Sequence, residues 1–195
     1  MNLNLTVDID QIVDVKDLEL KFVVKLTLKI EWFDVQLKWI NLNDESSTNF
    51  LSKREIDKIW TPKVQFGNSE NIKPIAVDNS AVFYIERRKP GESRIYLGEK
   101  RRAIYFEGKE NPLIYKRTYQ EEFFCNFDYS WFPFDTQKCY ITFKTFNSME
   151  RFVNIIPKKV IYSGQKSLMV FNVVDYYFDA VEDESDLVTL NIEYD

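Results

Sequence analysis

The chain's only two cysteines bound the segment Cys125-Asn126-Phe127-Asp128-Tyr129-Ser130-Trp131-Phe132-Pro133-Phe134-Asp135-Thr136-Gln137-Lys138-Cys139. Two unconnected buried thiols are one interpretation, because free cysteine packs as a small hydrophobic residue. A disulfide is the other, and closing this loop would stabilise the fold by about 3 kcal/mol in the chain-entropy description. We expect the disulfide, and with it an oxidising compartment. The loop would then hold an aromatic-proline-aromatic tip in one shape.

A long alternating stretch, Leu18–Trp32, lies upstream of this loop. Apolar side chains occupy every second position, at Leu18, Leu20, Phe22, Val24, Leu26, Leu28, Ile30 and Trp32. Strict alternation predicts a strand with one buried and one solvent-facing side. The first ten residues alternate in the same way, and Asp14–Asp17 breaks the pattern. These two segments therefore predict a hairpin.

The rest of the chain is also rich in short β-type segments. Further strands are expected at 81–86, 94–97, 103–106, 113–124, 139–146, 159–161, 170–177 and 187–193. Only Lys53–Ile59 favours a helix, since Ser52 and Glu55 form a capping-box pattern. Many strands with one short helix indicate an all-β sandwich. We expect a single domain over residues 1–195.

Composition argues against several classes of function. The net charge of −5 leaves no basic surface for nucleic acid, so no nucleic-acid partner is expected. Histidine is absent, which removes the usual general base and metal ligand. We therefore expect no enzyme, no cofactor and no metal; a hydrolase would need a site of carboxylates alone, and no spaced acid pair stands out. No apolar run is long enough to span a membrane. Asn4 begins a glycosylation sequon.

Together these motifs resemble the extracellular ligand-binding domain of the Cys-loop receptors, the pentameric ligand-gated ion channels. The resemblance rests on the Phe-Pro-Phe-Asp loop between the cysteines, on Trp32-x-Asp34-x-x-Leu37-x-Trp39, and on Trp60-Thr61-Pro62. We expect Trp32 and Trp60, with Asp34 and Pro62, to be structural. An aspartate close to a buried tryptophan more often makes a structural hydrogen bond than does chemistry.

The resemblance implies an immunoglobulin-like β-sandwich of about ten strands in a ring of five subunits, a homopentamer. A small-molecule agonist would bind between neighbouring subunits, on the extracellular side of the plasma membrane. Two elements would couple binding to a transmembrane domain that the chain lacks. They are the hairpin turn and the loop tip, comprising Asp14, Val15, Lys16, Asp17, Trp131, Phe132, Pro133, Phe134 and Asp135. The end at Asp195, where the family enters its first membrane helix, suggests an isolated extracellular domain.

The resemblance also places the ligand-binding positions by spacing. The principal face would comprise Gly67, Phe146, Tyr176, Tyr177 and Phe178, and the complementary face Thr27, Lys29, Tyr115 and Arg117. This is an incomplete version of the aromatic box that binds amines through ring faces. Lys29 with Tyr115 or Arg117 could instead hold a carboxylate, or be a solvated charge. An acidic tip at Glu182–Glu184 could bind a divalent cation or simply be solvated.

Some of these positions allow a structural role instead. Phe146 could be a core residue, and alternation sends only one of Tyr176 and Tyr177 inward. The leading interpretation of the whole chain is a receptor module that couples ligand binding to pore opening. It competes with a soluble binder similar to the acetylcholine-binding proteins, and with a structural subunit that has no working ligand site.

Overall fold

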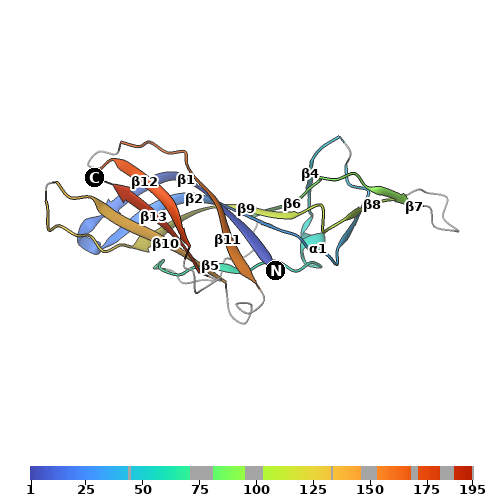
Figure 1. Cartoon of the computed structure of the whole chain (residues 1–195), viewed down its shortest axis with the longest axis horizontal. Helices are drawn as coiled ribbons and strands as arrows, with labels where there is room; N and C mark the ends of the chain where they lie inside the picture. Colours follow the sequence, from blue (N-terminus) through green and yellow to red (C-terminus); the bar gives the residue numbers. More distant parts are fainter. Residues whose placement is uncertain are drawn as a thin grey trace.

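Two long neighbouring strands, β1 (Asn2–Lys16) and β2 (Lys21–Trp32), extend between the middle of the molecule and the end at which the C-terminus is drawn (Figure 1). The structure is a computed structural model. It describes residues 1–43, 45–70, 81–94, 103–132, 134–145, 153–167, 171–180 and 187–194. The two strands pair antiparallel, with Leu5 opposite Ile30 and Ile9 opposite Leu26. The predicted hairpin is therefore confirmed.

Two sheets form the sandwich. The six-stranded sheet has the order β11-β1-β2-β9-β6-β4, and the four-stranded sheet has the order β12-β13-β10-β5. The remaining strands of the six-stranded sheet are β4 (Thr48–Phe50), β6 (Val82–Glu86), β9 (Leu113–Phe124) and β11 (Asn154–Tyr162). Those of the four-stranded sheet are β5 (Val64–Phe66), β10 (Gln137–Thr145), β12 (Val173–Ala180) and β13 (Leu187–Tyr194).

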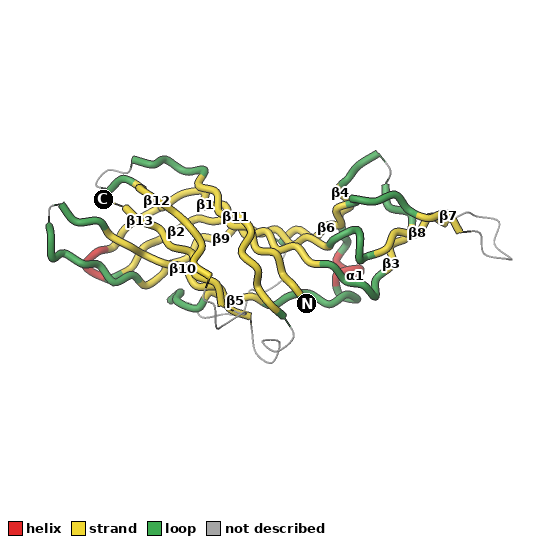
Figure 2. The backbone as a smooth tube through the Cα atoms, in the orientation of Figure 1, coloured by secondary structure: helices red, strands yellow, loops and turns green. Residues whose placement is uncertain are grey.

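A third, smaller sheet lies at the opposite end of the molecule from the C-terminus (Figure 2). It consists of β3 (Lys38–Ile40), β8 (Ala103–Glu107) and β7 (Glu92–Arg94). Together with β4 and β5, its short strands bring the described part of the chain above the ten or so strands expected. The all-β sandwich itself is confirmed, while assembly into a ring stays a prediction.

The core lies between the two large sheets. Phe66 on β5 packs edge-on against Tyr119 and Phe123 of the six-stranded sheet, at ring-centroid distances of 5.4 and 5.2 Å. It also contacts Phe143 of its own sheet at 5.7 Å. Phe66 is 4% exposed and Phe123 and Phe143 are fully buried. This aromatic cluster joins the two sheets.

The long strand is shorter than its alternation predicts. Leu18 and Leu20 continue the apolar pattern, but Asp17–Glu19 forms a 3₁₀ turn and Leu20 adopts a left-handed backbone with φ of 55°. Leu18 is 96% exposed. The strand therefore begins at Lys21, and β1 continues through the predicted break as far as Lys16.

The predicted helix is also shorter than expected. Helix α1 covers Lys53–Ile56, rather than extending to Ile59. The Glu55 carboxylate accepts hydrogen bonds from the Ser52 backbone N–H at 2.8 Å and from its hydroxyl at 2.6 Å. These bonds lower the pKa of Glu55. The capping box is therefore confirmed.

The side chain of Asn68 connects the two large sheets through hydrogen bonds. Its amide nitrogen donates to the Tyr140 carbonyl at 2.7 Å and to the Phe124 carbonyl at 3.3 Å. Its amide oxygen accepts from the Thr142 N–H at 2.9 Å. One side chain thus links β9 in the six-stranded sheet to β10 in the four-stranded sheet.

Replacing this link should measurably weaken the fold. We expect Asn68→Ala to lower the free energy of unfolding by about 2 kcal/mol, because several backbone groups lose their partner. Urea unfolding of wild type and variant measures the change. The control is Asn126→Ala, at an exposed position, which should leave the unfolding midpoint unchanged. Equal midpoints for Asn68→Ala and wild type would show that the link is dispensable.

Candidate functional site

The loop between the cysteines is closed twice. A disulfide joins Cys125 and Cys139, whose Cα atoms are 5.1 Å apart. Just inside it, the buried Gln137 donates from its amide nitrogen to the Asp128 carbonyl at 2.8 Å, and its amide oxygen accepts from the Asp128 N–H at 2.8 Å. Its amide nitrogen also bonds the Asp135 carboxylate. The disulfide confirms the pairing that we expected. The Gln137 hydrogen bonds hold the two sides of the loop together next to it.

The tip of this loop is apolar and open to solvent. Trp131, Phe132 and Phe134 are 79%, 74% and 90% exposed. Pro133 lies outside the described residues. Single apolar side chains are common on protein surfaces, but a group of exposed aromatic side chains on one loop indicates a surface that contacts another element. The tip has the properties of a surface that packs against another element.

The β1–β2 turn lies beside the base of this loop. The Cys125 N–H donates to the Leu20 carbonyl at 2.9 Å, and both elements lie at the end where the C-terminus is drawn (Figure 1). Strand β13 also ends here, with Tyr194 opposite Gln137. Of the expected coupling residues, Asp14, Val15 and Lys16 lie within β1, and only Asp17 lies in the turn. Lys16 forms an ion pair with Glu122 of β9.

Strand register decides which residues share the outer face of the six-stranded sheet. On β9, Lys116 lies opposite Lys29, and Thr118 lies opposite Thr27. The Thr27 and Thr118 hydroxyl oxygens are 2.8 Å apart, and the Thr27 hydroxyl also donates to Asp10 at 3.0 Å. Thr27 and Lys29 therefore lie on the polar face, as expected, together with Lys116 and Thr118.

Of the two interpretations of Lys29, the one in which it holds a carboxylate together with Tyr115 or Arg117 is wrong. Tyr115 lies opposite the buried Ile30, and Arg117 lies opposite the buried Leu28, so both point to the other face of the sheet. Tyr115 is 4% exposed and packs edge-on against Phe83 at 5.0 Å. The Arg117 guanidinium lies 4.6 Å from the centre of the Tyr119 ring.

The sequence held the signal for the correct residues. Apolar side chains occupy the odd-numbered positions Leu113, Tyr115, Tyr119 and Phe123 of β9. This alternation sends the even-numbered positions to the outer face. Lys116 and Thr118 could therefore have been selected by applying to β9 the argument that placed Thr27 and Lys29.

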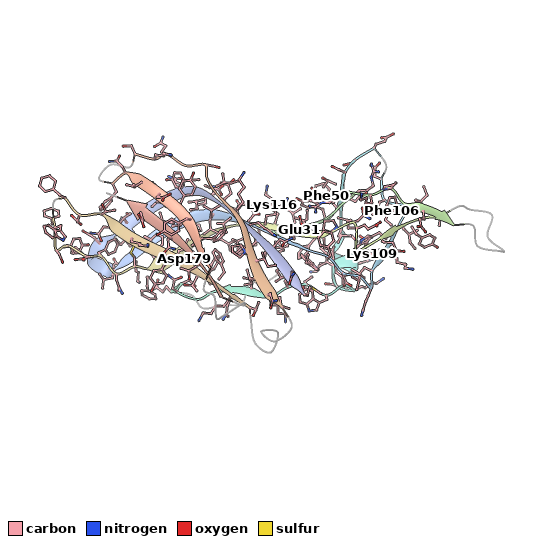
Figure 3. The ribbon with its side chains drawn as sticks, in the orientation of Figure 1. Glu31, Phe50, Phe106, Lys109, Lys116 and Asp179 are labelled. Atoms are coloured by element: carbon pink, nitrogen blue, oxygen red, sulfur yellow. A yellow bond between two sulfur atoms is a disulfide. The ribbon has the colours of Figure 1, made fainter. Side chains whose placement is uncertain are left out.

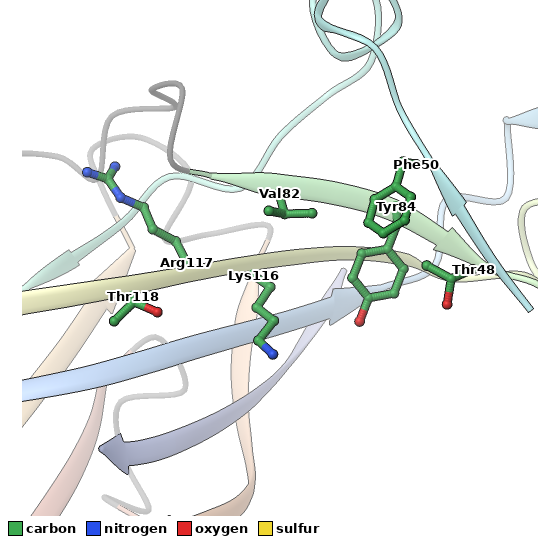
Figure 4. A pocket seen from close by; sticks show the side chains of 7 residues that line it. All are labelled: Thr48, Phe50, Val82, Tyr84, Lys116, Arg117 and Thr118. Atoms are coloured by element: carbon green, nitrogen blue, oxygen red, sulfur yellow. The ribbon is translucent and has the colours of Figure 1, made fainter. Parts of the chain in front are cut away.

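A shallow groove of about 410 Å³ lies over residues of β4, β6 and β9 (Figure 4). It is lined by Thr48, Phe50, Val82, Tyr84, Lys116, Arg117 and Thr118. The Phe50 and Tyr84 rings meet edge-on at 5.9 Å. Burial raises the pKa of Tyr84, with a smaller contribution from Glu86 and Glu31.

Two carboxylates near this groove, those of Glu31 and Glu86, share the guanidinium of Arg88. Arg88 donates to both oxygens of Glu31, at 3.2 and 2.5 Å, and to Glu86 at 2.7 Å. Its guanidinium also lies 5.8 Å from the Phe33 ring centre. Figure 3 shows Glu31, Lys116 and Phe50 near one another at the middle of the long axis.

The expected principal-face residues separate into two directions. Tyr176 and Phe178 pack against the core, and the Tyr176 ring lies 5.7 Å from that of Tyr162. Tyr177 points the other way, and its hydroxyl donates to Glu193 at 2.9 Å. The prediction that only one of the two tyrosines points inward is confirmed. This hydrogen bond and the neighbouring Lys138 lower the pKa of Glu193.

Gly67 lies at the edge of β5. Its N–H donates to the Thr142 carbonyl at 2.7 Å, and a Cβ atom there would meet Lys144 and Thr142 side-chain atoms at 3.0 and 3.2 Å. The close packing favours glycine here. Phe146 and the acidic tip Glu182–Glu184 lie outside the described residues, so the structure does not assemble a complete principal face.

The residues expected to be structural occupy such positions. Trp32 is fully buried, and the half-buried Trp60 packs edge-on against it at 6.3 Å. The Asp34 carboxylate accepts from the Gln36 N–H at 2.9 Å, in a structural hydrogen bond. Pro62 is half-buried just before β5.

Asn4 lies within the sheet rather than in a loop. It is half-buried on β1 between β11 and β2, and its amide donates to Glu31 at 3.3 Å. Its role as a glycosylation site stays a prediction.

The sequence matches the family described as the neurotransmitter-gated ion-channel ligand binding domain over residues 1–194. The chain belongs to this family. Ligand-binding domains of neurotransmitter-gated channels are extracellular receptor modules, not an enzyme class. Within the described ranges, no helix of this domain has the length and apolar character needed to cross a membrane.

Three nematode receptor subunits show the relationship in more detail. The domain is 25% identical over 156 residues to the acetylcholine receptor subunit alpha-type unc-38 of Caenorhabditis elegans, covering 80% of this chain and 25% of that subunit. It is 26% identical over 158 residues to des-2 and 27% over 143 residues to acr-15, both acetylcholine receptor subunits of the alpha type from the same organism. The alignments cover 80% and 72% of this chain. The chain spans about a quarter of the length of these relatives.

Proposed function

We propose that this ligand-binding domain binds a small ligand between neighbouring subunits of a pentameric ring, and transmits binding to a membrane-spanning domain through the Cys125–Cys139 loop. The carrying observation is the exposed apolar tip of Trp131, Phe132 and Phe134 on a loop closed by both the disulfide and Gln137. A rigid apolar tip transmits displacement to whatever it packs against, because closely packed contacts are not freely deformable. The tip lies beside the β1–β2 turn and the end of β13.

The ligand side of the proposal rests on the outer face of the six-stranded sheet. Thr27, Lys29, Lys116, Thr118 and Tyr84 present hydroxyl and ammonium groups along one side of the subunit. The revised complementary face replaces Tyr115 and Arg117 with Lys116 and Thr118. Ligand binding would shift an equilibrium between resting and active states that exists before the ligand arrives.

A chimeric receptor tests this function. The chain replaces the 156 residues of unc-38 that align with it, and ligand-evoked current is recorded with acetylcholine, amines and amino acids as probes. Phe132→Ser with Phe134→Ser should abolish the current, because the tip loses its apolar contact, while ligand binding to the assembled chimera stays intact. Surface labelling controls for delivery to the membrane.

The outcomes separate coupling from binding. A tip variant that reaches the surface and conducts like the unsubstituted chimera would overturn the coupling role. Ligand binding by the purified, self-assembled domain without any current from a surface-expressed chimera would instead favour a soluble binding protein. Binding is measured as a rise in melting temperature, since a ligand that binds only the native state stabilises it.

A further inference from the structure

Four charged side chains meet next to the β1–β2 turn. Lys16, at the end of β1, lies opposite Lys21, at the start of β2. Lys16 forms an ion pair with Glu122 of β9, and the Lys21 ammonium lies 2.8 Å from the Glu70 carboxylate. Two like charges directly opposite each other would destabilise the hairpin. Each of these lysines instead has a carboxylate partner from another part of the chain.

Glu70 ends a short segment that begins at Gly67, one of the expected ligand-binding positions. Segment 67–70 is bonded through its backbone to the strands on either side of it. These N–H to carbonyl contacts, at 2.7, 3.1 and 3.1 Å, are Gly67 to Thr142, Phe124 to Asn68, and Glu70 to Glu122. Ser69, between them, is buried. Closely packed structure of this kind transmits a displacement rather than absorbing it.

The Lys21–Glu70 ion pair joins this segment to the turn. The Lys21 side chain is only 16% exposed, and its ammonium also lies 5.6 Å from the centre of the Phe124 ring. The hydrogen bond to Glu70 raises the pKa of Lys21, so Lys21 is charged at neutral pH. Surface ion pairs contribute little to the free energy of unfolding. The value of this pair therefore lies in the two elements that it connects.

We propose that the Lys21–Glu70 ion pair carries displacements of segment 67–70 to the β1–β2 turn, so that both residues are positioning residues for coupling. The proposal rests on the function proposed above and assigns one route within that coupling. A ligand that displaces the backbone at Gly67 moves Glu70 with it, and Glu70 draws the Lys21 ammonium and the start of β2. Lys16 and Glu122 hold the other strand of the hairpin to β9, so the turn tilts.

Gly67→Ala tests this relay without a ligand. The added Cβ would lie 3.0 Å from Cε of Lys144 and 3.2 Å from side-chain atoms of Thr142, contacts that are relieved by a small shift of segment 67–70. In the purified chain, the backbone amide chemical shifts of Leu18, Leu20 and Lys21 should therefore change. Adding Glu70→Gln should reduce this change by about half or more, because glutamine forms no charge-assisted hydrogen bond.

Further variants separate the ion pair from its surroundings. Lys21→Met should reduce the response of the Leu18 and Leu20 amides as Glu70→Gln does, and the reversed pair, Glu70→Lys with Lys21→Glu, should restore it. The matched control is Lys25→Met, on the same face of β2 but opposite Gln120, which should leave the response unchanged. The urea midpoint of each variant should stay close to that of wild type, since surface ion pairs contribute little to stability.

The receptor chimera provides a functional measurement, with acetylcholine as the probe. Glu70→Gln should raise the acetylcholine concentration for half-maximal current by about two- to fivefold, the effect expected for one partly exposed ion pair. The reversed pair should return this concentration toward that of the unsubstituted chimera, and Lys25→Met should not change it.

Two results would overturn the relay. One is a turn that does not respond to Gly67→Ala, and the other is a response of equal size with and without Glu70→Gln, which would mean that the displacement travels through the sheet alone. A conducting chimera whose half-maximal concentration is unaffected by Glu70→Gln would reject the coupling role and leave the receptor function standing. A surface-expressed chimera that is silent with every probe, while the purified chain shows the relay, would reject the receptor function instead.

Discussion

Phe66→Ala is expected to lower the free energy of unfolding by about 3–5 kcal/mol, the range for removing a large aromatic side chain from a core. Phe66 contributes a ring that contacts Tyr119, Phe123 and Phe143 at once. It comes from β5, a strand of only three residues, so little neighbouring structure can move to fill the space. The effect should be measured by urea unfolding followed by near-ultraviolet circular dichroism.

The matched control for this prediction is Phe50→Ala. Phe50 also comes from a three-residue strand, β4, but is 71% exposed. Its removal should change the unfolding midpoint far less, because little apolar surface returns to water. A Phe66→Ala protein as stable as Phe50→Ala would show that the ring cluster between the sheets is not what joins them.

Replacing both cysteines, in Cys125→Ala with Cys139→Ala, should lower the free energy of unfolding by about 3 kcal/mol. Both cysteines are buried, so the substitutions also remove some packed sulfur volume. Hydrogen exchange adds a local measurement, and the amides of residues 126–132 should exchange faster in the variant. Wild type in reducing buffer should show the same changes.

The Gln137 bonds set a limit on this effect. Since Gln137 still joins the base of the loop to Asp128, the core strands β9 and β10 should keep their pairing and protection. Exchange rates in the loop that are identical with and without the disulfide would assign its closure to Gln137 alone. Gln137→Ala in the cysteine-free background would then be the variant that opens the loop.

Alternation in the sequence predicted the long strands because one face of each is buried. Strand β9 has the predicted bounds, Leu113–Phe124, since its apolar positions contact the core along its whole length. The strands β3, β4 and β5 have three residues each, which is too short for a period of two to be visible. Leu18 and Leu20 fit the alternation but lie in a turn, because periodicity does not report where the chain reverses.

The candidate site was harder to predict because it depends on pairing between strands. Alternation within each strand indicates which of its residues face outward, but only the register of β2 against β9 shows that Lys116 and Thr118 lie directly opposite Lys29 and Thr27. The choice of Tyr115 and Arg117 took odd-numbered positions of β9. The apolar residues at other odd-numbered positions of this strand already indicated that this side faces the core. The sequence carried no signal for the role of Gln137, because its hydrogen bond to Asp128 depends on the conformation of the loop.

The parallel pairing of β1 with β11 affects the order of events during synthesis and folding. Asn2 lies opposite Asn154 and Ile9 lies opposite Tyr162, so β1 is synthesised about 150 residues before the strand that pairs with it. Antiparallel β2 is available at once, but one edge of β1 stays unpaired until residue 162 has emerged. Contacts so distant in sequence slow folding, and an unpaired strand edge invites association with other chains. We therefore expect the nascent receptor domain to depend on protection of its N-terminal edge during most of its translation.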